Sequence, residues 1–248
     1  MITKNELDIL AEKYETEEFI KDDPIQFPHR FSNKKDIELA GFIASLLAYG
    51  SRQQFIKKLD YLFENIAQNE PLNFIENFEP GVLGDFNYRF GKTYDFTEIF
   101  RLLKELYTTS NGLEDLFEYG ANQNRLHEAV VDYFYSRVNS DVGQGFYHMI
   151  PNPHKGGAMK RMNMFLRWMI RKGNVDLGIW NFLSPSELLI PLDVHVGRIS
   201  RKMGLLTRNA NDFKSVIELT NNLKNFCPND PVKYDFALFG LGVDEKFQ

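Results

Sequence analysis

The sequence predicts an all-α protein, and three observations lead to this fold class. Apolar residues recur at spacings of three and four through most of the chain, which is the pattern of amphipathic helices. No stretch alternates between apolar and polar residues as a half-buried strand does, and no internal repeat is present. The chain has 248 residues, 43% of them hydrophobic, so it can bury a sizeable core. We expect one domain of two helical lobes with a central cleft, at about 30–140 and 150–248, plus an N-terminal helix.

The first part of the chain carries clear helix signals. Asp36 has the residue type and position of a helix N-cap, and Gly50 marks a helix end. The prolines at 24 and 28 predict an extended or turn-rich link before that helix. Helices are predicted at about 6–14, 37–49, 53–66, 71–78, 95–108, 113–119 and 123–138. The segment 81–94 is rich in Gly and aromatic residues and fits either a loop or a short helical piece.

The second part of the chain begins with a connector over 139–153, which contains glycines and two prolines. Residues 173–190 fit a loop with a short helix. Further helices are predicted at about 157–171, 193–203, 211–225 and 231–239.

Composition excludes several classes of protein. The one cysteine, Cys227, excludes an intrachain disulfide and a site of several cysteines for zinc or an iron–sulfur cluster. The N-terminus lacks the basic and apolar regions of a signal peptide, and no apolar stretch approaches the ~20 residues that span a bilayer. The histidines show no metal-ligand spacing. We therefore expect a cytoplasmic monomer with no membrane partner, no cofactor and no metal.

Charge is distributed unevenly along the chain. The net charge is −5, which by itself argues against a nucleic-acid partner. Residues 155–208, however, hold ten Lys and Arg against three acids, a net charge of +7, so the rest of the chain carries −12. Because a phosphate backbone responds to charge within a Debye length of roughly 8–10 Å, a basic segment on an acidic body remains compatible with nucleic-acid binding.

Asp193 stands at the start of a predicted helix, followed by three cations at 198, 201 and 202. Aspartate is a favoured N-cap, so a purely structural role is one interpretation. The positive end of the helix dipole also favours a carboxylate at this position. Such a carboxylate can stabilise a developing oxocarbenium ion or deprotonate a nucleophile. The sequence is compatible with both roles.

A second basic element precedes the Asp193 segment. The small residues Gly156 and Gly157 open the helix predicted at 157–171, and they leave backbone N–H groups open to a phosphate. Lys160, Arg167 and Arg171 share one face of that helix, which is either solvated or in contact with phosphate. The amine of Lys160 could also attack a sugar C1′ and form a Schiff base.

Several segments resemble the helix–hairpin–helix DNA glycosylases, the superfamily of endonuclease III and 8-oxoguanine glycosylase. Residues 190–201, Ile-Pro-Leu-Asp-Val-His-Val-Gly-Arg-Ile-Ser-Arg, resemble its Val-Asp-Thr/Val-His-Val-x-Arg segment. Residues 39–53 resemble its early helix with the loop that probes the duplex, and 234–240 are similar to its final core helix. Residues 156–169 and 230–237 resemble a bacterial family of uncharacterised proteins in this superfamily, and that resemblance covers nearly the whole chain.

The chain departs from the superfamily pattern at the hairpin. The usual Leu-Pro-Gly-Val-Gly-x-Lys/Arg-Thr-Ala is replaced by residues 151–160. Lys160 lies 33 residues before Asp193, and Lys172 lies 21 residues before it but follows the helix instead of opening it. A long spacing with an atypical hairpin is similar to the archaeal 8-oxoguanine glycosylase branch, so the lysine is carried over to Lys160. The iron–sulfur cluster of endonuclease III is excluded by composition.

The resemblance implies a DNA-repair glycosylase and abasic-site lyase that acts on damaged bases in duplex DNA. Asp193 and Lys160 would be the catalytic pair. Residues expected to hold the DNA are Lys155, Gly156, Gly157, Arg161, Arg167, Arg198, Arg201, Arg52 and Gln53. Residues expected at the pocket of a flipped base are Trp168, Phe146 and His195.

Two other classes of function remain open. The missing hairpin favours a protein that keeps the fold and binds nucleic acid without catalysis. The acidic body favours a helical module that binds a protein or a small molecule.

Overall fold

The computed structural model describes residues 2–244, and their regular secondary structure is helical. Thirteen α-helices, several 3-10 turns and one π-helical turn make up this part of the chain, and it contains isolated bridges but no strand. The prediction of an all-α fold is confirmed. Within the same part of the chain, no helix is long and apolar enough to cross a membrane.

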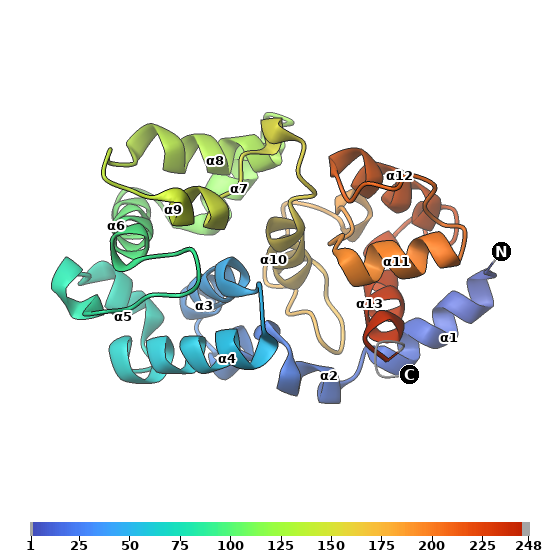
Figure 1. The fold of residues 1–248 in the computed structure, drawn as a ribbon, viewed down its shortest axis with the longest axis horizontal. Helices are drawn as coiled ribbons and strands as arrows, with labels where there is room; N and C mark the ends of the chain where they lie inside the picture. Colours follow the sequence, from blue (N-terminus) through green and yellow to red (C-terminus); the bar gives the residue numbers. More distant parts are fainter. Residues whose placement is uncertain (1, 245–248) are drawn as a thin grey trace. The chain divides into compact units, whose positions relative to one another are not determined.

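Contacts divide the chain into two compact units (Figure 1). We call residues 24–152 the central unit. Residues 2–23 together with 153–244 form the terminal unit, so the N-terminal segment belongs with the C-terminal half of the chain. The expected central cleft stays a prediction.

The central unit contains seven α-helices. Their bounds are α3 (Lys34–Leu47), α4 (Arg52–Asp60), α5 (Pro71–Glu76), α6 (Thr93–Thr109), α7 (Leu113–Asn122), α8 (Leu126–Arg137) and α9 (Gln144–Met149). Helix α3 is central to its core, because every residue from 37 to 47 is buried. Helix α9 lies within the segment predicted as a connector, where six residues are too few to show a helical period.

The N-cap of α3 differs from the prediction. Asn33 caps this helix, and its side-chain oxygen accepts from the backbone N–H groups of Lys35 at 2.8 Å and Asp36 at 3.4 Å. Asp36 lies in the first turn instead, where its carboxylate accepts from the backbone N–H of Leu72 at 2.8 Å. The prediction was wrong because Asn and Asp are equally good caps and the competing partner of Asp36 is 36 residues away.

Two segments of the central unit have unusual backbone. Helix α4 continues without a break into a π-helical turn over Tyr61–Ile66. The unassigned segment 81–94 contains a 3-10 turn, Pro80–Leu83, followed by a tight turn that Tyr88 and Gly91 close with two backbone hydrogen bonds of 2.9 and 2.8 Å.

The terminal unit contains the remaining six α-helices. Their bounds are α1 (Lys4–Tyr14), α2 (Glu17–Asp22), α10 (Lys160–Ile170), α11 (Val194–Lys202), α12 (Phe213–Lys224) and α13 (Tyr234–Asp244). Helix α13 packs against both α1 and α11, and Figure 1 shows α1 beside α13. Their apolar side chains form one core, which includes Leu7, Val196, Ile199 and Leu238.

Glycines allow α13 to approach its neighbours closely. A Cβ at Gly240 would overlap the ring of Tyr14, and one at Gly242 would come within 2.9 Å of the His195 Cβ. The helix predicted to end near residue 239 therefore runs on to Asp244. The two glycines serve packing between helices and not termination.

Glu38 is a fully buried acid in α3. Its carboxylate accepts from the Glu114 backbone N–H at 3.1 Å and from the Tyr107 hydroxyl at 3.3 Å. Burial nevertheless raises the pKa of Glu38 to about 7. The folded protein therefore holds a proton on Glu38 at pH values where the unfolded chain has released it.

This pKa difference predicts a pH-dependent stability. As pH rises from about 4.5 to about 7, Glu38 should remove roughly 3 kcal/mol from the free energy of unfolding. The variant Glu38→Gln can keep the bond from the Glu114 N–H on its amide oxygen and can donate from its amide nitrogen to the Tyr107 hydroxyl. It does not titrate and should lose this slope. Urea unfolding across the pH range measures the difference, with the exposed Glu118→Gln as control. Equal slopes in Glu38→Gln and the unsubstituted protein would contradict the assignment.

Candidate active site

Lys160 and Asp193 meet at the starts of two helices in the terminal unit. Lys160 is the first residue of α10, and Asp193 is the N-cap of α11. The Lys160 Nζ lies 3.8 Å from the Asp193 Oδ2, and their side chains are 28% and 19% exposed. Two residues that are 33 positions apart in sequence therefore form an ion pair that solvent can reach.

The two carboxylate oxygens of Asp193 have different partners. Its Oδ1 accepts from the backbone N–H groups of His195 and Val196, both at 2.9 Å, so the predicted N-cap is confirmed. Its Oδ2 is the atom closest to Lys160. The cap thus fixes the orientation of the carboxylate and leaves the second oxygen for chemistry at the helix start.

The start of α10 differs from the prediction. The helix begins at Lys160 and not near residue 157, after Met159 in the left-handed conformation at φ +50°. The N–H of Gly156 donates to the Pro153 carbonyl at 3.0 Å, and the Gly156 carbonyl accepts from the Phe213 N–H at 2.9 Å. Gly156 and Gly157 therefore belong to a loop bound to the start of α12, and they do not supply the N–H groups of the helix terminus.

This loop is nevertheless open. Gly156 and Gly157 are exposed, and a Cβ added at either would contact nothing within 4 Å. Gly156 also has a φ of +74°, which glycine adopts without strain. Lys155 is exposed beside them. The loop can therefore approach a ligand closely through its backbone.

Arg167 and Arg171 are buried on the same helix. Arg167 donates to Asp176 at 3.1 Å and to Asp235, and Arg171 donates to the same Asp176 at 3.0 Å. Arg171 also pairs with Glu15 and Asp230, at 2.5 and 2.9 Å. We call these six residues the buried ion cluster. The ring of Phe236 lies under both guanidinium groups, at 4.3 and 5.5 Å from their carbons.

The predicted phosphate contact of Arg167 is therefore wrong, because this side chain is 2% exposed and already neutralised. The sequence showed no acid on the face of α10, and the acids come from four other segments of the terminal unit. Separating such a pair from its partners costs several kcal/mol, so Arg167 cannot turn outward to a phosphate.

Asp235 links the buried ion cluster to the exposed pair. Burial raises the pKa of Asp235 to about 7, against the opposite pull of Arg167. The Asp193 carboxylate raises this pKa further, and the Lys160 ammonium lowers it. The Oδ1 of Asp235 is buried without a hydrogen-bond partner among the described residues. The charges of Lys160 and Asp193 therefore influence the protonation of a buried carboxyl in the terminal unit.

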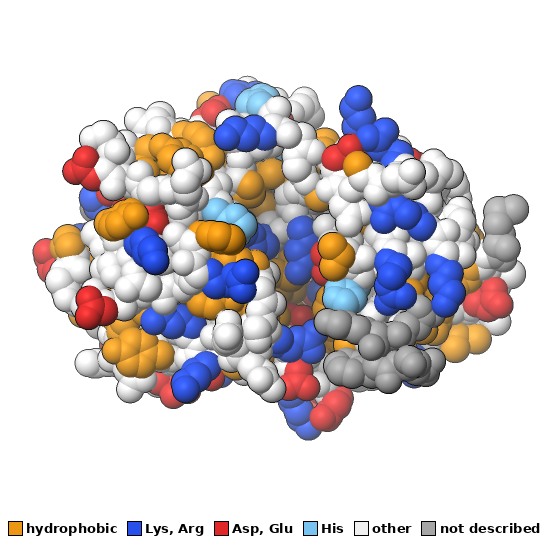
Figure 2. Space-filling view, viewed as in Figure 1, with side chains coloured by type: hydrophobic (Ala, Val, Ile, Leu, Met, Phe, Trp, Pro, Cys, Tyr) orange, Lys and Arg blue, Asp and Glu red, His pale blue; other side chains and the backbone are white. Residues whose placement is uncertain are grey.

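Of the other arginines of the terminal unit predicted to contact DNA, two are accessible to solvent and one holds a loop of the protein. Arg198 is exposed on α11 and donates to the Gly242 carbonyl at 2.9 Å, and Arg161 is half-buried on α10. Arg201 donates to the carbonyls of Arg208 and Ala210, at 2.7 and 3.1 Å, so its guanidinium holds the loop after α11. Figure 2 shows Lys and Arg side chains gathered over α11.

Two predicted residues of the base pocket are wrong. Trp168 and Phe146 are both 0% exposed, Trp168 on α10 of the terminal unit and Phe146 on α9 of the central unit. Neither can stack on a base without unpacking its core. His195 is half-buried, and its Nδ1 lies 3.1 Å from the Gly242 carbonyl, a contact that joins α11 to α13.

Arg52 and Gln53 belong to the first turn of α4 in the central unit, half-buried and exposed respectively. Their predicted contact with a DNA strand stays a prediction. No group of three or more His, Cys, Asp or Glu side chains in residues 2–244 could hold a metal ion.

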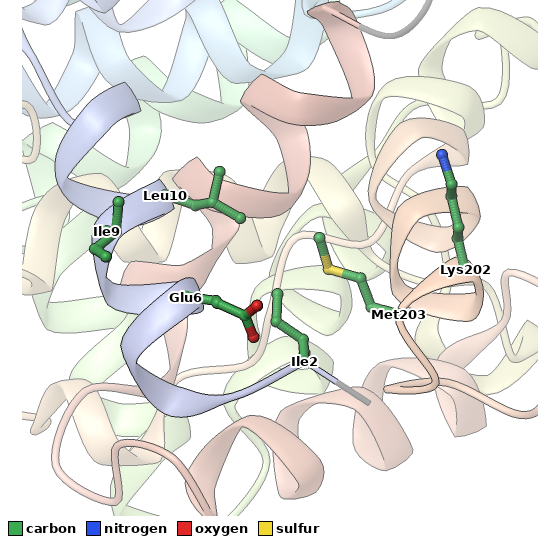
Figure 3. Close-up of a pocket in the computed structure, with 6 residues that line it drawn as sticks. All are labelled: Ile2, Glu6, Ile9, Leu10, Lys202 and Met203. Atoms are coloured by element: carbon green, nitrogen blue, oxygen red, sulfur yellow. The ribbon is translucent and has the colours of Figure 1, made fainter.

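A separate groove lies between α1 and the end of α11. Figure 3 shows Ile2, Leu10 and Met203 around it, with Lys202 pointing away. Its volume is about 510 Å³, and its lining is mainly apolar. Helix α11 rises about 1.5 Å per residue, so the groove lies about 15 Å along the helix from Asp193. It is not part of the Lys160–Asp193 site.

Comparison with known families gives one match. The model of a family described as a protein of unknown function, DUF2400, matches residues 23–244. The chain belongs to the DUF2400 family. No curated protein and no solved structure matches it. Because the match begins at residue 23, Glu15 of this DUF2400 chain lies outside the matched segment, although it pairs with Arg171.

Sequence reasoning missed Asp176 and Asp235 as residues of this region. A signal for Asp235 was present, because it is a lone acid in the apolar run Tyr-Asp-Phe-Ala-Leu-Phe. A charge in such a run is rarely buried unless it is paired. Asp176 sits in an irregular loop, where no periodicity marks it as buried.

The buried ion cluster predicts a large cost for removing one cation. Arg167→Met keeps most of the side-chain length but leaves Asp235 without its hydrogen-bonded cation and Asp176 with Arg171 alone. We expect a loss of about 3–5 kcal/mol in the free energy of unfolding, measured by urea titration. The matched control is Arg208→Met, which breaks a solvent-accessible pair with Asp212 and should cost far less than Arg167→Met. Equal losses in the two variants would contradict the burial argument.

The split roles of the Asp193 oxygens predict a difference between two substitutions. Asp193→Ala removes the acceptor for both N–H groups and should cost about 1 kcal/mol. Asp193→Asn keeps an oxygen for the cap and should leave the melting temperature unchanged. Thermal unfolding by circular dichroism measures both, with the N-cap variant Asp212→Ala of α12 as a reference. If Asp193→Asn were as destabilising as Asp193→Ala, the cap would not be the main structural role.

Proposed function

We propose that this protein is a DNA N-glycosylase with abasic-site lyase activity, acting on damaged bases in duplex DNA. One observation carries the proposal: the Lys160 Nζ and the Asp193 Oδ2 lie 3.8 Å apart and are partly exposed. An amine and a carboxylate at this distance are the two groups that the reaction requires. The resemblance of residues 190–201 to the aspartate segment of helix–hairpin–helix glycosylases adds support.

The proposed reaction proceeds in successive steps, with Lys160 as the nucleophile. Lys160, as a free amine, attacks C1′ of the deoxyribose, and the bond from C1′ to the base nitrogen breaks with its electron pair leaving on the base. The departing base takes a proton. Ring opening gives a Schiff base between Lys160 and C1′. A base then removes a proton from C2′, and the bond between C3′ and the 3′ phosphate oxygen breaks with its electron pair leaving on the phosphate.

Asp193 has two roles open to it in this reaction. Its Oδ2 can accept the proton that Lys160 must lose before attack, or its negative charge can stabilise the sugar cation as the base departs. The cap on Oδ1 supports either role, because it fixes the carboxylate before the substrate binds.

The surface around the pair supports an anionic polymer as substrate. Lys155 and Arg198 are exposed, and Arg161 is half-buried at the start of α10. The target base would have to leave the duplex stack, which costs a few kcal/mol and is easiest for a damaged or mispaired base. Contacts to the phosphates supply binding energy for that step.

Borohydride trapping on duplex DNA with an abasic site tests the proposal. The unsubstituted protein should form a covalent adduct, because borohydride reduces the Schiff base to a stable amine. Lys160→Gln should form none. The control Lys172→Gln changes the other lysine near the required spacing, which is exposed, and should form the adduct normally. Asp193→Asn should slow trapping by about 10²–10⁴-fold. Absence of an adduct, together with no base release from a panel of damaged duplexes, would reject the proposal.

A second candidate is nucleic-acid binding without catalysis. The ion pair favours it, because an amine held by Asp193 can be structural, and so does the missing hairpin signature. This candidate predicts salt-dependent DNA affinity that Asp193→Asn leaves unchanged, with no trapped adduct. A third candidate, a helical interaction module, is favoured by the apolar groove of Figure 3. It predicts no nucleic-acid binding even at low salt.

A further inference from the structure

A basic pocket lies in the central unit, outside the Lys160–Asp193 site. It is formed by one face of α4 and the tight turn before α6. Its lining includes Gln54, Lys57, Lys58, Tyr61 and Arg89. Its volume is about 460 Å³, within the roughly 300–1,000 Å³ of small-molecule sites. Figure 2 shows Lys and Arg side chains among hydrophobic ones over α4.

The pocket has an excess of positive charge. Lys57, Lys58 and Arg89 line it, and no acid does. None of these three cations forms an ion pair with any residue in 2–244. The Lys58 Nζ lies 4.2 Å from the centre of the Phe86 ring, and burial lowers the pKa of this lysine. Three cations without counter-charges, one of them partly desolvated, attract an anion.

Tyr61 provides a flat surface in the same pocket. Its side chain is 50% exposed, and the Lys58 Nζ lies 5.5 Å from its ring centre. It begins the π-helical turn that follows α4. Such turns are rare and frequently lie at functional sites. The exposed ring beside cations can stack on a second planar ring.

The wall that carries Arg89 is rigid. The Tyr49 hydroxyl donates to the Tyr88 carbonyl at 3.2 Å, and the Tyr88 hydroxyl donates to the Tyr49 carbonyl. Arg89 itself has a φ of +49°, an uncommon conformation for a residue with a side chain. Its side chain lies over Gly50, where a Cβ would come within 2.7 Å of a guanidinium nitrogen. Such strain persists where the surroundings impose it and is common at ligand sites.

We propose that this pocket binds a nucleotide, with its phosphate on Lys57, Lys58 and Arg89 and its base stacked on Tyr61. A simple inorganic anion would use the cations but not the ring, and an apolar ligand would leave the cations unpaired. A phosphorylated aromatic base uses both. The same chemistry is offered by a free nucleotide and by one residue of a single-stranded nucleic acid. This inference does not depend on the Lys160–Asp193 pair.

Binding of two probes tests the proposal. The probes are AMP, followed by isothermal titration calorimetry, and a short fluorescein-labelled oligothymidylate, followed by anisotropy. Tyr61→Ala should weaken binding at least about fivefold, whereas Tyr61→Phe should retain it, because stacking needs the ring and not the hydroxyl. The double variant Lys57→Gln, Lys58→Gln should lower the slope of log affinity against log salt by about 1.4 for the oligonucleotide. The double variant Lys172→Gln, Lys214→Gln, which removes two exposed lysines of the terminal unit, is the charge-matched control and should change neither.

The two probes separate the sources of the ligand. Binding of AMP that requires the Tyr61 ring identifies a free-nucleotide site, and binding of the oligonucleotide alone identifies a single-strand site. The proposal is overturned if neither probe binds at low salt, or if Tyr61→Ala and the lysine variant both bind as the unsubstituted protein does. Borohydride trapping on abasic duplex keeps the outcomes distinct. If Tyr61→Ala binds both probes as well as the unsubstituted protein does, while the unsubstituted protein forms a normal adduct, only the pocket is rejected. If probe binding requires the Tyr61 ring but the unsubstituted protein forms no adduct, only the glycosylase is rejected.

Discussion

Two guanidinium groups buried on α10 determine the arrangement of the terminal unit. Arg167 and Arg171 cannot remain in a core without carboxylates, so Asp176, Asp235, Asp230 and Glu15 must converge on one helix face. These acids come from the loop after α10, from α13, from the turn before α13 and from the end of α1. The hydrophobic contacts of these elements tolerate small shifts, but the hydrogen-bonded geometry of the ions does not. The buried ion cluster therefore specifies how the elements are placed.

The exposed pair depends on this buried frame. Lys160 lies about two turns before Arg167 on α10, so the position of its backbone is fixed once the cluster has formed. Asp193 is fixed independently by its own helix start. The pKa of Asp235 lies near neutrality and is sensitive to both groups of the pair. A change in the charge state at the surface is thus felt in the interior.

The sequence was sufficient for the helical class, for most helices and for the cap at Asp193, because these depend on local periodicity and on local hydrogen bonds. It also suggested Lys160 and Asp193 as partners. The predicted phosphate contact of Arg167 and the predicted base contact of Trp168 were wrong. Periodicity shows which residues share a face of α10, but it does not show which segments pack against that face. The acids around Arg167 lie up to 68 positions away, and nothing in the sequence of α10 identifies them as its partners. Likewise, the basic pocket of the central unit combines α4 with a turn whose conformation the sequence left undetermined.

The division of the terminal unit between the two ends of the chain has a consequence for its synthesis. Residues 24–152 are continuous and can fold as soon as they leave the ribosome. Helix α1 is made before the central unit, and its packing partner α13 is made after it. While the central unit is being made, the apolar face of α1 therefore lacks its partner α13, and the carboxylate of Glu15 lacks its partner Arg171. The contacts between α1 and α13 join residues that are far apart in the sequence, and contacts of such large separation form slowly.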